Sequence, residues 1–497
     1  MSCSRPQNRL YTAAQVRELD RVAIEDQGID GFELMQRAAS AAFDVLKQLW
    51  PQARNILVVC GSGNNGGDGY LLACLALRAG LKVTLIEAAD SAFLKGDAAL
   101  ACQHWQQCGG TSGSLALLAE AQFDVDVIVD GLLGTGLQRP VSGEWAQLIA
   151  QINSAHCPVL ALDIASGLNA DTGQIMGVAI KAQATISFIG MKRGLYTASG
   201  TDCSGTLFFN DLDVPGDVYE QVSASTCVMD DQERQALLPP RNTACHKGDC
   251  GHVLLVGGDS GMPGAIQMAA LAAARTGAGL VSIATRSEHA AKIATACPGL
   301  MAHAVESSGD LEPLLQRASV VAIGPGLGQG AWASALLDEV LEPGLPLVVD
   351  ADGLNLLAKK RLKYSNWILT PHPAEAARLL QRTTAEIQSD RFAAVTDIAT
   401  QYEGVAVLKG NGSLINGHDD EMVYLCGQGN PGMATAGMGD VLSGVIAALV
   451  AQGLSLPQAA RLGVYIHANA ADSASIDGQR GLLATDLLPA IRQWVNP

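Results

Sequence analysis

Two series of strand-length apolar runs dominate this chain, and each run is followed by a glycine-containing turn and a helix-like segment. Strands that alternate with helices form parallel sheets covered by helices on both faces. The pattern therefore predicts an α/β protein. The first series comprises residues 55–60, 82–87, 126–136, 158–163 and 184–190, and the second comprises 252–258, 280–285, 319–324, 346–352, 367–373 and 404–412.

The alternation is interrupted at residues 213–245, where prolines accompany a polar run. Such a stretch is typical of a connection between domains, and 497 residues are enough for more than one domain. We place the boundary near residues 220–228. We predict a Rossmann-like α/β/α sandwich over residues 1–222 and a second α/β domain over residues 223–497.

Ahead of the first series, residues 12–50 show the apolar spacing of helices. Thr12 is a candidate N-cap because its hydroxyl can accept from the first backbone N–H groups of a helix. Two glycines then break the pattern before a second helix, which we expect at residues 32–49.

Composition limits where the protein works and what it binds. Mean hydropathy is positive, but no window holds 18 uninterrupted apolar residues, so we expect no transmembrane helix. The first residues lack the apolar core of a signal peptide, and we expect a cytoplasmic protein with no membrane partner. A net charge of −17 argues against nucleic acid as a partner.

Polar residues follow several strands of the first series. The loop at residues 61–69 carries Asn65 among its glycines, and Asp130 and Asp163 end two further strands, with Ser166 close behind. Ligands bind beyond the carboxyl ends of parallel strands. Asn65, Asp130 and Ser166 supply oxygen ligands only, which suits a hard cation such as potassium. The alternative is that these residues cap strand ends and turns.

In the second series, the segment GNPGMATAGMGD at residues 429–440 runs into a strongly apolar stretch. We expect a buried helix that begins at or just before Asp440. Glycines ahead of a helix allow backbone N–H groups to approach an anion, and an aspartate beside a bound phosphate can take a proton from a hydroxyl. The alternative is a plain N-cap role for Asp440.

Two other loops follow strands of the second series. The sequence TPHP holds His372 between two prolines, where we favour ligand contact over the structural role that a lone histidine usually has. The sequence KGNGS, residues 409–413, offers Lys409 and several backbone N–H groups as a phosphate cradle. The alternative for this second loop is a simple hairpin turn.

The first half of the chain resembles the NAD(P)H-hydrate epimerase family over residues 12–215, through NNGGDGY, VDGLLGTGL, LDIASGLNADTG and FIGMKRGL. The resemblance implies a Rossmann-like fold that interconverts the R and S epimers of hydrated NADH and NADPH. It implies potassium near Asn65, Asp130 and Ser166, with Asp163 as the candidate acid/base and Lys192 as a weaker supporting charge. The implied substrate contacts are Asn64, Gly134, Thr135, Gly136, Leu137, Gln138, Arg139, Pro140 and Asp163.

The second half resembles the ribokinase-like superfamily, and more closely the ADP-dependent NAD(P)H-hydrate dehydratase family, over residues 229–495. The matching motifs are HKGDCGHVLLVGG, GPGLG, DADGLN, TPHP, KGNGS and GNPGMATAGMGD. One departure is Ala374, where many relatives are expected to have glycine. The implied contacts to the hydrated cofactor are Ala265, Gly326, His372 and Asp440, and those to the nucleotide are Lys409, Gly410, Asn411, Gly412, Ser413 and Gly439.

These resemblances imply a fused enzyme that repairs hydrated NAD(P)H. The first domain epimerises the two forms, and the second dehydrates the S form at the expense of ADP, giving AMP and phosphate, with Mg²⁺ offsetting the phosphate charge. They also imply a homo-oligomer, a tetramer or larger. The alternative is a ribokinase-like kinase of a vitamin precursor, fused to a Rossmann-like module that binds without catalysis.

Overall fold

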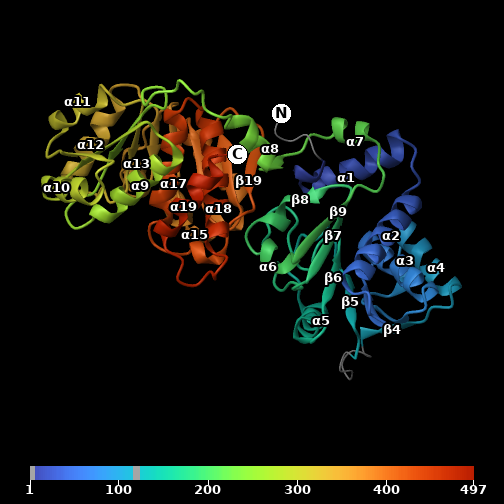
Figure 1. Ribbon diagram of the computed structural model, residues 1–497. Coiled ribbons are helices and arrows are strands. Elements are labelled where there is room, and N and C mark those ends of the chain that lie inside the picture. Colours follow the sequence, from blue (N-terminus) through green and yellow to red (C-terminus); the bar gives the residue numbers. More distant parts are fainter. Residues whose placement is uncertain (1–5, 116–123, 497) are drawn as a thin grey trace. The chain divides into compact units, whose positions relative to one another are not determined.

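The structure is a computed structural model that describes residues 6–115 and 124–496 (Figure 1). The chain divides into two compact units, of which the first ends at Thr226 and the second begins at Cys227. Parallel strands alternate with helices in both units. The predicted α/β fold class is therefore confirmed.

The first unit is built on a seven-stranded parallel sheet in the order β4-β3-β2-β5-β6-β7-β9. Strands β3 and β4 lie on one side of β2, and the later strands, from β5 onward, lie on its other side. A reversal of this kind leaves a crevice at the carboxyl ends of the two central strands. The strands are β2 (Asn55–Cys60), β3 (Lys82–Glu87), β4 (Ser112–Ser114), β5 (Val127–Gly131), β6 (Val159–Leu162), β7 (Ala184–Phe188) and β9 (Thr206–Asn210). A separate short pair joins β1 (Arg9–Tyr11) to β8 (Met191–Lys192) in parallel.

Helices flank this sheet, with α2, α3 and α4 grouped beside one another in Figure 1. Their apolar faces and the strands form one buried core, which contains Leu46, Val58, Leu72 and Leu160. The helices are α1 (Ala13–Arg21), a π-helical turn η2 (Val22–Asp26), α2 (Gly31–Leu49), α3 (Asn64–Arg78), α4 (Gly96–Gln107), α5 (Gly143–Ser154), α6 (Gly200–Ser204) and α7 (Gly216–Gln221), with short 3-10 turns η1 (Pro6–Asn8), η3 (Ser91–Phe93) and η5 (Arg193–Tyr196).

The start of α3 differs from the sequence prediction. We expected a glycine loop through residue 69, but the helix already begins at Asn64. A side chain at Gly66 would place its Cβ only 2.1 Å from the Gly61 carbonyl oxygen, so the first turn packs directly against the preceding loop. The glycines thus serve close packing of a helix start. The N-cap prediction for Thr12 is confirmed, because its side chain accepts from the Gln15 backbone.

The second unit contains strands in the order β13-β12-β11-β14-β15-β16-β17-β18-β19. Pairing is parallel as far as β17, and the last two pairs are antiparallel. The strands are β11 (His252–Val256), β12 (Leu280–Thr285), β13 (Met301–Ala304), β14 (Val320–Ile323), β15 (Leu347–Val349), β16 (Trp367–Leu369), β17 (Val405–Leu408), β18 (Ser413–Gly417) and β19 (Val423–Cys426), and β10 (Thr226–Val228) lies where the units meet in the sequence.

Helix α17 is the buried helix of this unit. It begins at Met438, two residues before Asp440, and its apolar stretch is buried as predicted. Gly444 allows a close approach to α9, since a Cβ there would lie 2.0 Å from the Ala269 carbonyl oxygen. The helices are α8 (Asp231–Leu237), α9 (Pro263–Thr276), α10 (Ser287–Ala296), α11 (Glu312–Leu315), α12 (Ala331–Leu341), α13 (Ala351–Lys360), α14 (Pro373–Leu380), α15 (Thr384–Ser389), α16 (Arg391–Tyr402), α17 (Met438–Ala451), α18 (Leu456–Ala474) and α19 (Leu487–Trp494), with 3-10 turns η6 (Ser308–Asp310), η7 (Pro431–Met433) and η8 (Ala484–Asp486).

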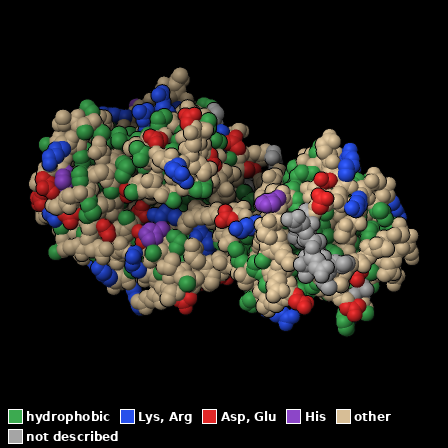
Figure 2. Space-filling model, turned by 90° about the horizontal axis from the view of Figure 1, so that it is seen from below, with side chains coloured by type: hydrophobic (Ala, Val, Ile, Leu, Met, Phe, Trp, Pro, Cys, Tyr) green, Lys and Arg blue, Asp and Glu red, His purple; other side chains and the backbone are tan. Residues whose placement is uncertain are grey.

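Two further properties concern membrane-spanning helices and the distribution of surface charge. Within the described residues, no helix is both long and apolar enough to cross a membrane. Acidic and basic side chains are interspersed on the face of each unit that Figure 2 shows.

Candidate active sites

A cavity of about 980 Å³ lies in the first unit. Its lining includes residues that follow β2 and β5, between which the sheet order reverses, and residues that follow β6. The structure therefore brings together most of the substrate contacts that the sequence predicted. Of these, the cavity is lined by Asn64, Gly134, Thr135, Gly136, Leu137, Gln138, Arg139 and Asp163, whereas Pro140 is not among the lining residues.

Asp163 and Lys192 form an ion pair in the wall of this cavity. Lys192 is fully buried, and its ammonium also donates to the Ser187 hydroxyl and the Phe188 carbonyl, each at 3.1 Å. Asp163 adopts a left-handed backbone conformation with φ 63°. Such strain in a non-glycine residue persists only where the surrounding structure enforces it. The pair is thus held in a fixed position at the cavity wall.

Two further carboxyl groups share the environment of Lys192. Burial raises the pKa of Asp20 to about 6; the Lys192 charge opposes this shift, and the Asp163 charge adds to it. Burial also raises the pKa of Asp68 well above its usual range, with help from the charges of Asp163 and Asp20. Asp20 and Asp68 therefore retain a proton more readily than exposed carboxyl groups do. This arrangement suits proton exchange with a bound ligand.

Asn65, Asp130 and Ser166 converge beside the turn that follows β5. The Ser166 hydroxyl donates to Asp130 Oδ1 over 2.6 Å, and its backbone N–H donates to Oδ2 over 2.8 Å. The Leu133 backbone N–H donates to Ser166 Oγ at 2.8 Å, and the Asn65 amide donates to the Leu133 carbonyl at 2.9 Å. The three side chains are therefore linked through one turn.

This oxygen cluster fits a cation. The Asn65 Oδ1 atom is buried and has no hydrogen-bond partner among the residues that the structure describes. Asp130 is fully buried, and burial raises its pKa to about 6 although Ser166 and Leu132 donate hydrogen bonds to it. A buried carboxylate and an unsatisfied carbonyl oxygen are both stabilised by a positive ion. The ligands are all oxygens, as potassium requires.

In the second unit, Asp440 lies in the first turn of α17 but does not cap it. The N-cap is Gly437, which has φ 91° and makes no side-chain cap. The alternative interpretation of Asp440 as a plain N-cap is therefore wrong. A glycine is required at the cap because of its left-handed backbone. The carboxylate of Asp440 is left available for another role.

Lys409 is the cation at the centre of this second site. Its Nζ lies 2.7 Å from Asp350 Oδ1 and 4.0 Å from Glu375 Oε2. A Cβ added to Gly439 would lie 3.1 Å from the same Nζ. Lys409 and Asp440 also lie close enough for the charge of each to shift the pKa of the other. The structure thus places Lys409, Gly439 and Asp440 close together, and Asp350 and Glu375 lie beside them.

The acids of this cluster have pKa values that are shifted in different directions. Burial acts to raise the pKa of Asp350, but the Lys409 charge and hydrogen bonds from Lys409 and Ser443 outweigh it, so this pKa is lowered. Burial raises the pKa of Asp440 to about 7; Asp350 reinforces the shift, and Lys409 opposes it. Burial also raises the pKa of Glu375. Asp350 is therefore the ionised partner of Lys409, and Asp440 can gain or lose a proton near neutral pH.

His372 is the N-cap of α14, and its side chain is about half exposed. Its Nδ1 accepts from the Ala374 backbone N–H at 3.1 Å, and Glu375 Oε2 accepts from the His372 backbone N–H at 2.8 Å. Burial and the nearby Lys409 charge lower the pKa of His372. A neutral imidazole is thus placed next to the Lys409 cluster. Alanine at position 374 leaves this cap intact.

The remaining predicted contacts come from two loops. Gly326 has φ 59°, and a Cβ there would lie 3.3 Å from the Cβ of Ala265, so these two residues are neighbours. The same loop passes directly against the cluster, since a Cβ at Gly324 would lie 1.8 Å from the Asp350 carbonyl oxygen. The GPGLG loop and the start of α9 therefore form one wall near Asp350.

The KGNGS segment is a hairpin turn between β17 and β18, as the alternative interpretation held. The turn is held from behind by Arg391, a buried residue that donates to the carbonyl oxygens of Leu408 and Gly412 at 3.4 and 3.1 Å. The Lys409 backbone N–H donates to the Pro371 carbonyl at 2.9 Å, which joins this turn to the TPHP loop. A rigid hairpin thus directs Lys409 toward Asp350.

Comparisons with known proteins agree with this division. Residues 31–194 match the family model described as YjeF-related protein N-terminus, and residues 253–493 match the model described as NAD(P)H-hydrate dehydratase. The bifunctional NAD(P)H-hydrate repair enzyme Nnr of Coxiella burnetii is 50% identical over 98% of this chain and 99% of its own length.

Solved structures resemble the second unit. A ribokinase-like superfamily protein of Enterococcus faecalis is 27% identical, with a TM-score of 0.50 over 54% of this chain and 94% of its own. An ADP/ATP-dependent NAD(P)H-hydrate dehydratase of Bacillus subtilis, co-crystallised with ATP and Mg²⁺, is 29% identical, with a TM-score of 0.48 over 53% of this chain and 96% of its own.

The fold and the two sites define an enzyme in which an α/β unit with a proton-sharing cavity precedes a ribokinase-like unit with a lysine–carboxylate cluster. Both units match over nearly their whole length in one relative. The chain belongs to the family of bifunctional NAD(P)H-hydrate repair enzymes, with an epimerase and a dehydratase unit. The alternative of a vitamin-precursor kinase fused to a non-catalytic module is set aside.

Proposed function

We propose that this enzyme restores hydrated NADH and NADPH in two steps. The first domain, residues 1–222, interconverts the R and S epimers, and the second, residues 223–497, dehydrates the S epimer at the expense of ADP. The observation that carries the proposal is the position of Asp440 beside Lys409 and Gly439, with its pKa raised to about 7 by burial and by Asp350. A base with such a pKa is well matched to neutral pH.

In the dehydratase site, Asp440 takes the proton of the hydroxyl at C6 of the hydrated nicotinamide ring. The oxygen then accepts the terminal phosphoryl group of ADP, and AMP is the leaving group. Cleavage of the C6–O bond releases phosphate, and loss of a ring proton restores the double bond. The glycine-rich start of α17, including Gly437 and Gly439, stabilises the phosphoryl charge through backbone N–H groups without reorganising.

The proposed nucleotide contacts are the Lys409–Ser413 hairpin and Gly439, and the proposed cofactor contacts are Ala265, Gly326, His372 and Asp440. The cluster carries three carboxyl groups, those of Asp350, Glu375 and Asp440, against the single ammonium of Lys409. This excess of acid suits a divalent cation, and Glu375 would hold Mg²⁺ together with the nucleotide phosphates. Bound Mg²⁺ would offset charge on the transferring phosphoryl group.

In the epimerase site, Asp163 exchanges a proton with the hydrated ring while the buried Lys192 fixes its position and charge. Asn64 and the segment from Gly134 to Pro140 hold the ligand. Asn65, Asp130 and Ser166 would hold a potassium ion behind the Asn65–Leu133 turn, where it supplies a positive charge beside the cavity. By resemblance to relatives, we also propose a homo-oligomer, a tetramer or larger, which light scattering of the purified protein tests.

The experiment is an assay of each purified epimer of hydrated NADH with ADP, with ATP and with no nucleotide. We expect the S epimer and ADP to yield NADH, AMP and phosphate in equal amounts, and we expect the R epimer to react only while the first site is intact. A stable phosphorylated product without NADH would instead identify a kinase. Conversion of the R epimer by a folded Asp163→Asn variant would remove the epimerase assignment.

A further inference from the structure

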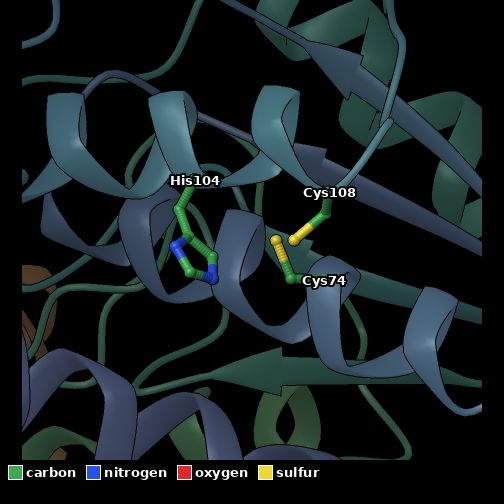
Figure 3. A group of neighbouring side chains, drawn as sticks. All are labelled: Cys74, His104 and Cys108. Carbon is green, nitrogen blue, oxygen red and sulfur yellow. The ribbon is translucent and has the colours of Figure 1, made fainter.

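A cluster of metal-binding side chains lies between α3 and α4, away from both sites described above. It consists of Cys74 on α3 and of His104 and Cys108 at the end of α4. One ligand atom from each residue lies within 4.8 Å of the others. Figure 3 shows the two sulfur atoms pointing toward each other between the helices, with the imidazole directed into the same space.

The spacing of these residues explains how they meet. His104 and Cys108 are four positions apart and therefore lie on one face of α4. Cys74 and Arg78 are also four apart, on the face of α3 that packs against α4. A pair of ligands from one helix and a third from the helix beside it is an arrangement that can close around a single ion.

We propose that Cys74, His104 and Cys108 bind a zinc ion that links α3 to α4, with a water molecule as the fourth ligand. Two sulfur ligands and one imidazole select a borderline-soft cation such as Zn²⁺ over Mg²⁺ or Ca²⁺. Cys74 is buried, whereas His104 and Cys108 are partly exposed, so the ion has a route from solvent and a side open to water.

The charge balance of the cluster supports this ion. Two thiolates neutralise a divalent cation, so the bound site adds no net charge to a partly buried position. An Arg78 guanidinium nitrogen lies 3.3 Å from Cys108 Sγ and 3.1 Å from His104 Nε2. Arg78 therefore acts as a hydrogen-bond donor behind the ligands, and it turns away from the imidazole when the ion enters.

The consequence for the enzyme follows from the path of α3. The helix starts at Asn64 and Asn65, which line the epimerase cavity, and Cys74 lies nine residues beyond Asn65. That separation is roughly 14 Å along the helix axis. Zinc would stabilise the far half of α3 against α4 without entering the cavity.

The test uses the full-length protein, fully reduced and stripped of metal. Equilibrium dialysis against Zn²⁺ followed by elemental analysis should give one zinc per chain, and Co²⁺ should give the absorption bands of sulfur coordination. Cys74→Ser and Cys108→Ser should each weaken binding by at least about tenfold. The matched control is Cys245→Ser, because Cys245 and Cys250 form a second thiol pair with Sγ atoms 3.5 Å apart. That control should keep full binding.

Alkylation of the unmodified sequence provides a readout that needs no variant. Saturating zinc should protect the partly exposed Cys108 from alkylation, as mass spectrometry of peptides detects, and should leave Cys245 reactive. The proposal is overturned if wild type binds no zinc, or if the Cys245 variant loses the ion and the Cys74 variant keeps it. It is also overturned if the reduced protein binds no zinc but forms a Cys74–Cys108 disulfide with peroxide, which would identify a redox pair.

Discussion

The Nζ atom of Lys409 lies 2.7 Å from Oδ1 of Asp350, and this ion pair lies at the centre of the carboxylate cluster of the second unit. Asp350 also accepts from the Ser443 hydroxyl at 2.8 Å, so both of its carboxylate oxygens have partners. Burial raises the pKa of Asp440, and the stabilised negative charge of Asp350 adds to this shift. One acid of the cluster is thus kept ionised, while another is kept near its titration point.

The first prediction concerns Asp440→Asn. The amide keeps the size of the side chain but cannot accept the hydroxyl proton, so kcat for dehydration should fall about 10²–10⁴-fold. ADP affinity should change little, because backbone N–H groups carry most of the phosphate contact. Single-turnover kinetics and nucleotide titration measure the two effects. The control is Asp338→Asn, an exposed surface acid paired with Lys360.

Epimerisation should be untouched in the Asp440→Asn variant, since Asp440 belongs to the second unit. A folded variant that dehydrates the S epimer within tenfold of wild type would show that Asp440 is not the base.

The pH dependence of dehydration follows from the same group. Asp440 must be ionised to act as a base, and its pKa is raised to about 7 by burial and by Asp350. The rate should therefore fall about tenfold per unit of pH below 7 and level off above it. A pH profile of kcat measures this, and the residual profile of Asp440→Asn serves as the reference for titration of the nucleotide. A wild-type profile that is flat from pH 5 to 8 would contradict the assignment.

The raised pKa also predicts an effect on stability. Because Asp440 binds its proton more tightly in the folded protein, the unfolded chain loses that proton first as pH rises. The contribution of this group to stability is therefore largest below about pH 4 and falls as pH rises toward 7. Asp440→Asn should raise the Tm of the second unit more at pH 8 than at pH 5. Equal shifts at both pH values would mean that the carboxylate is not destabilised by burial.

Much of the fold was predictable because hydrophobic periodicity carries the information. Each expected strand run contains a strand, and the apolar run after Asp440 is a buried helix. Strand β19 was missed, and the antiparallel β18 was expected only under the alternative of a hairpin turn, since strand–helix alternation predicts parallel pairing. The early start of α3 was missed because glycines normally interrupt helices. Here their missing side chains allow the first turn to pack against Gly61.

The sites were predictable where a motif sits at a strand end, and less so where packing assembles them. Asp350 directly follows β15, so the rule that singled out Asp130 and Asp163 would have found it. Asp20 gives no such signal, because it lies within α1 between charged neighbours such as Glu18 and Arg21 and reads as an ordinary helix residue. Only the packing of α1 against the cavity reveals it. Charged residues that come together only through tertiary packing have no characteristic spacing in the sequence.

Asp163→Ala should abolish conversion of the R epimer and leave dehydration of the S epimer nearly intact. The reason is that Asp163 lines a cavity wholly within the first unit and is the ion-pair partner of the buried Lys192. Coupled assays starting from each epimer separate the two activities. Asp44→Asn, a change at an exposed acid on α2, is the matched control. Equal loss of both activities in a folded Asp163 variant would defeat the two-site assignment.

The last prediction tests the oxygen cluster formed by Asn65, Asp130 and Ser166. The buried, unpartnered Asn65 Oδ1 and the buried Asp130 carboxylate should both be stabilised by potassium. Potassium at a hundredfold excess over its dissociation constant would add about 2.7 kcal/mol to the stability of the folded state. The Tm of the first unit should therefore rise with potassium and respond less to lithium, whose small radius does not span the ligands.

Asp130→Asn removes the charge but keeps the shape, so it should lose the potassium-dependent part of the Tm. Epimerisation should weaken in parallel when potassium is replaced, while dehydration continues. Unchanged epimerase rates and Tm in rigorously potassium-free buffer would show that Asp130 and Ser166 only brace the turn after β5.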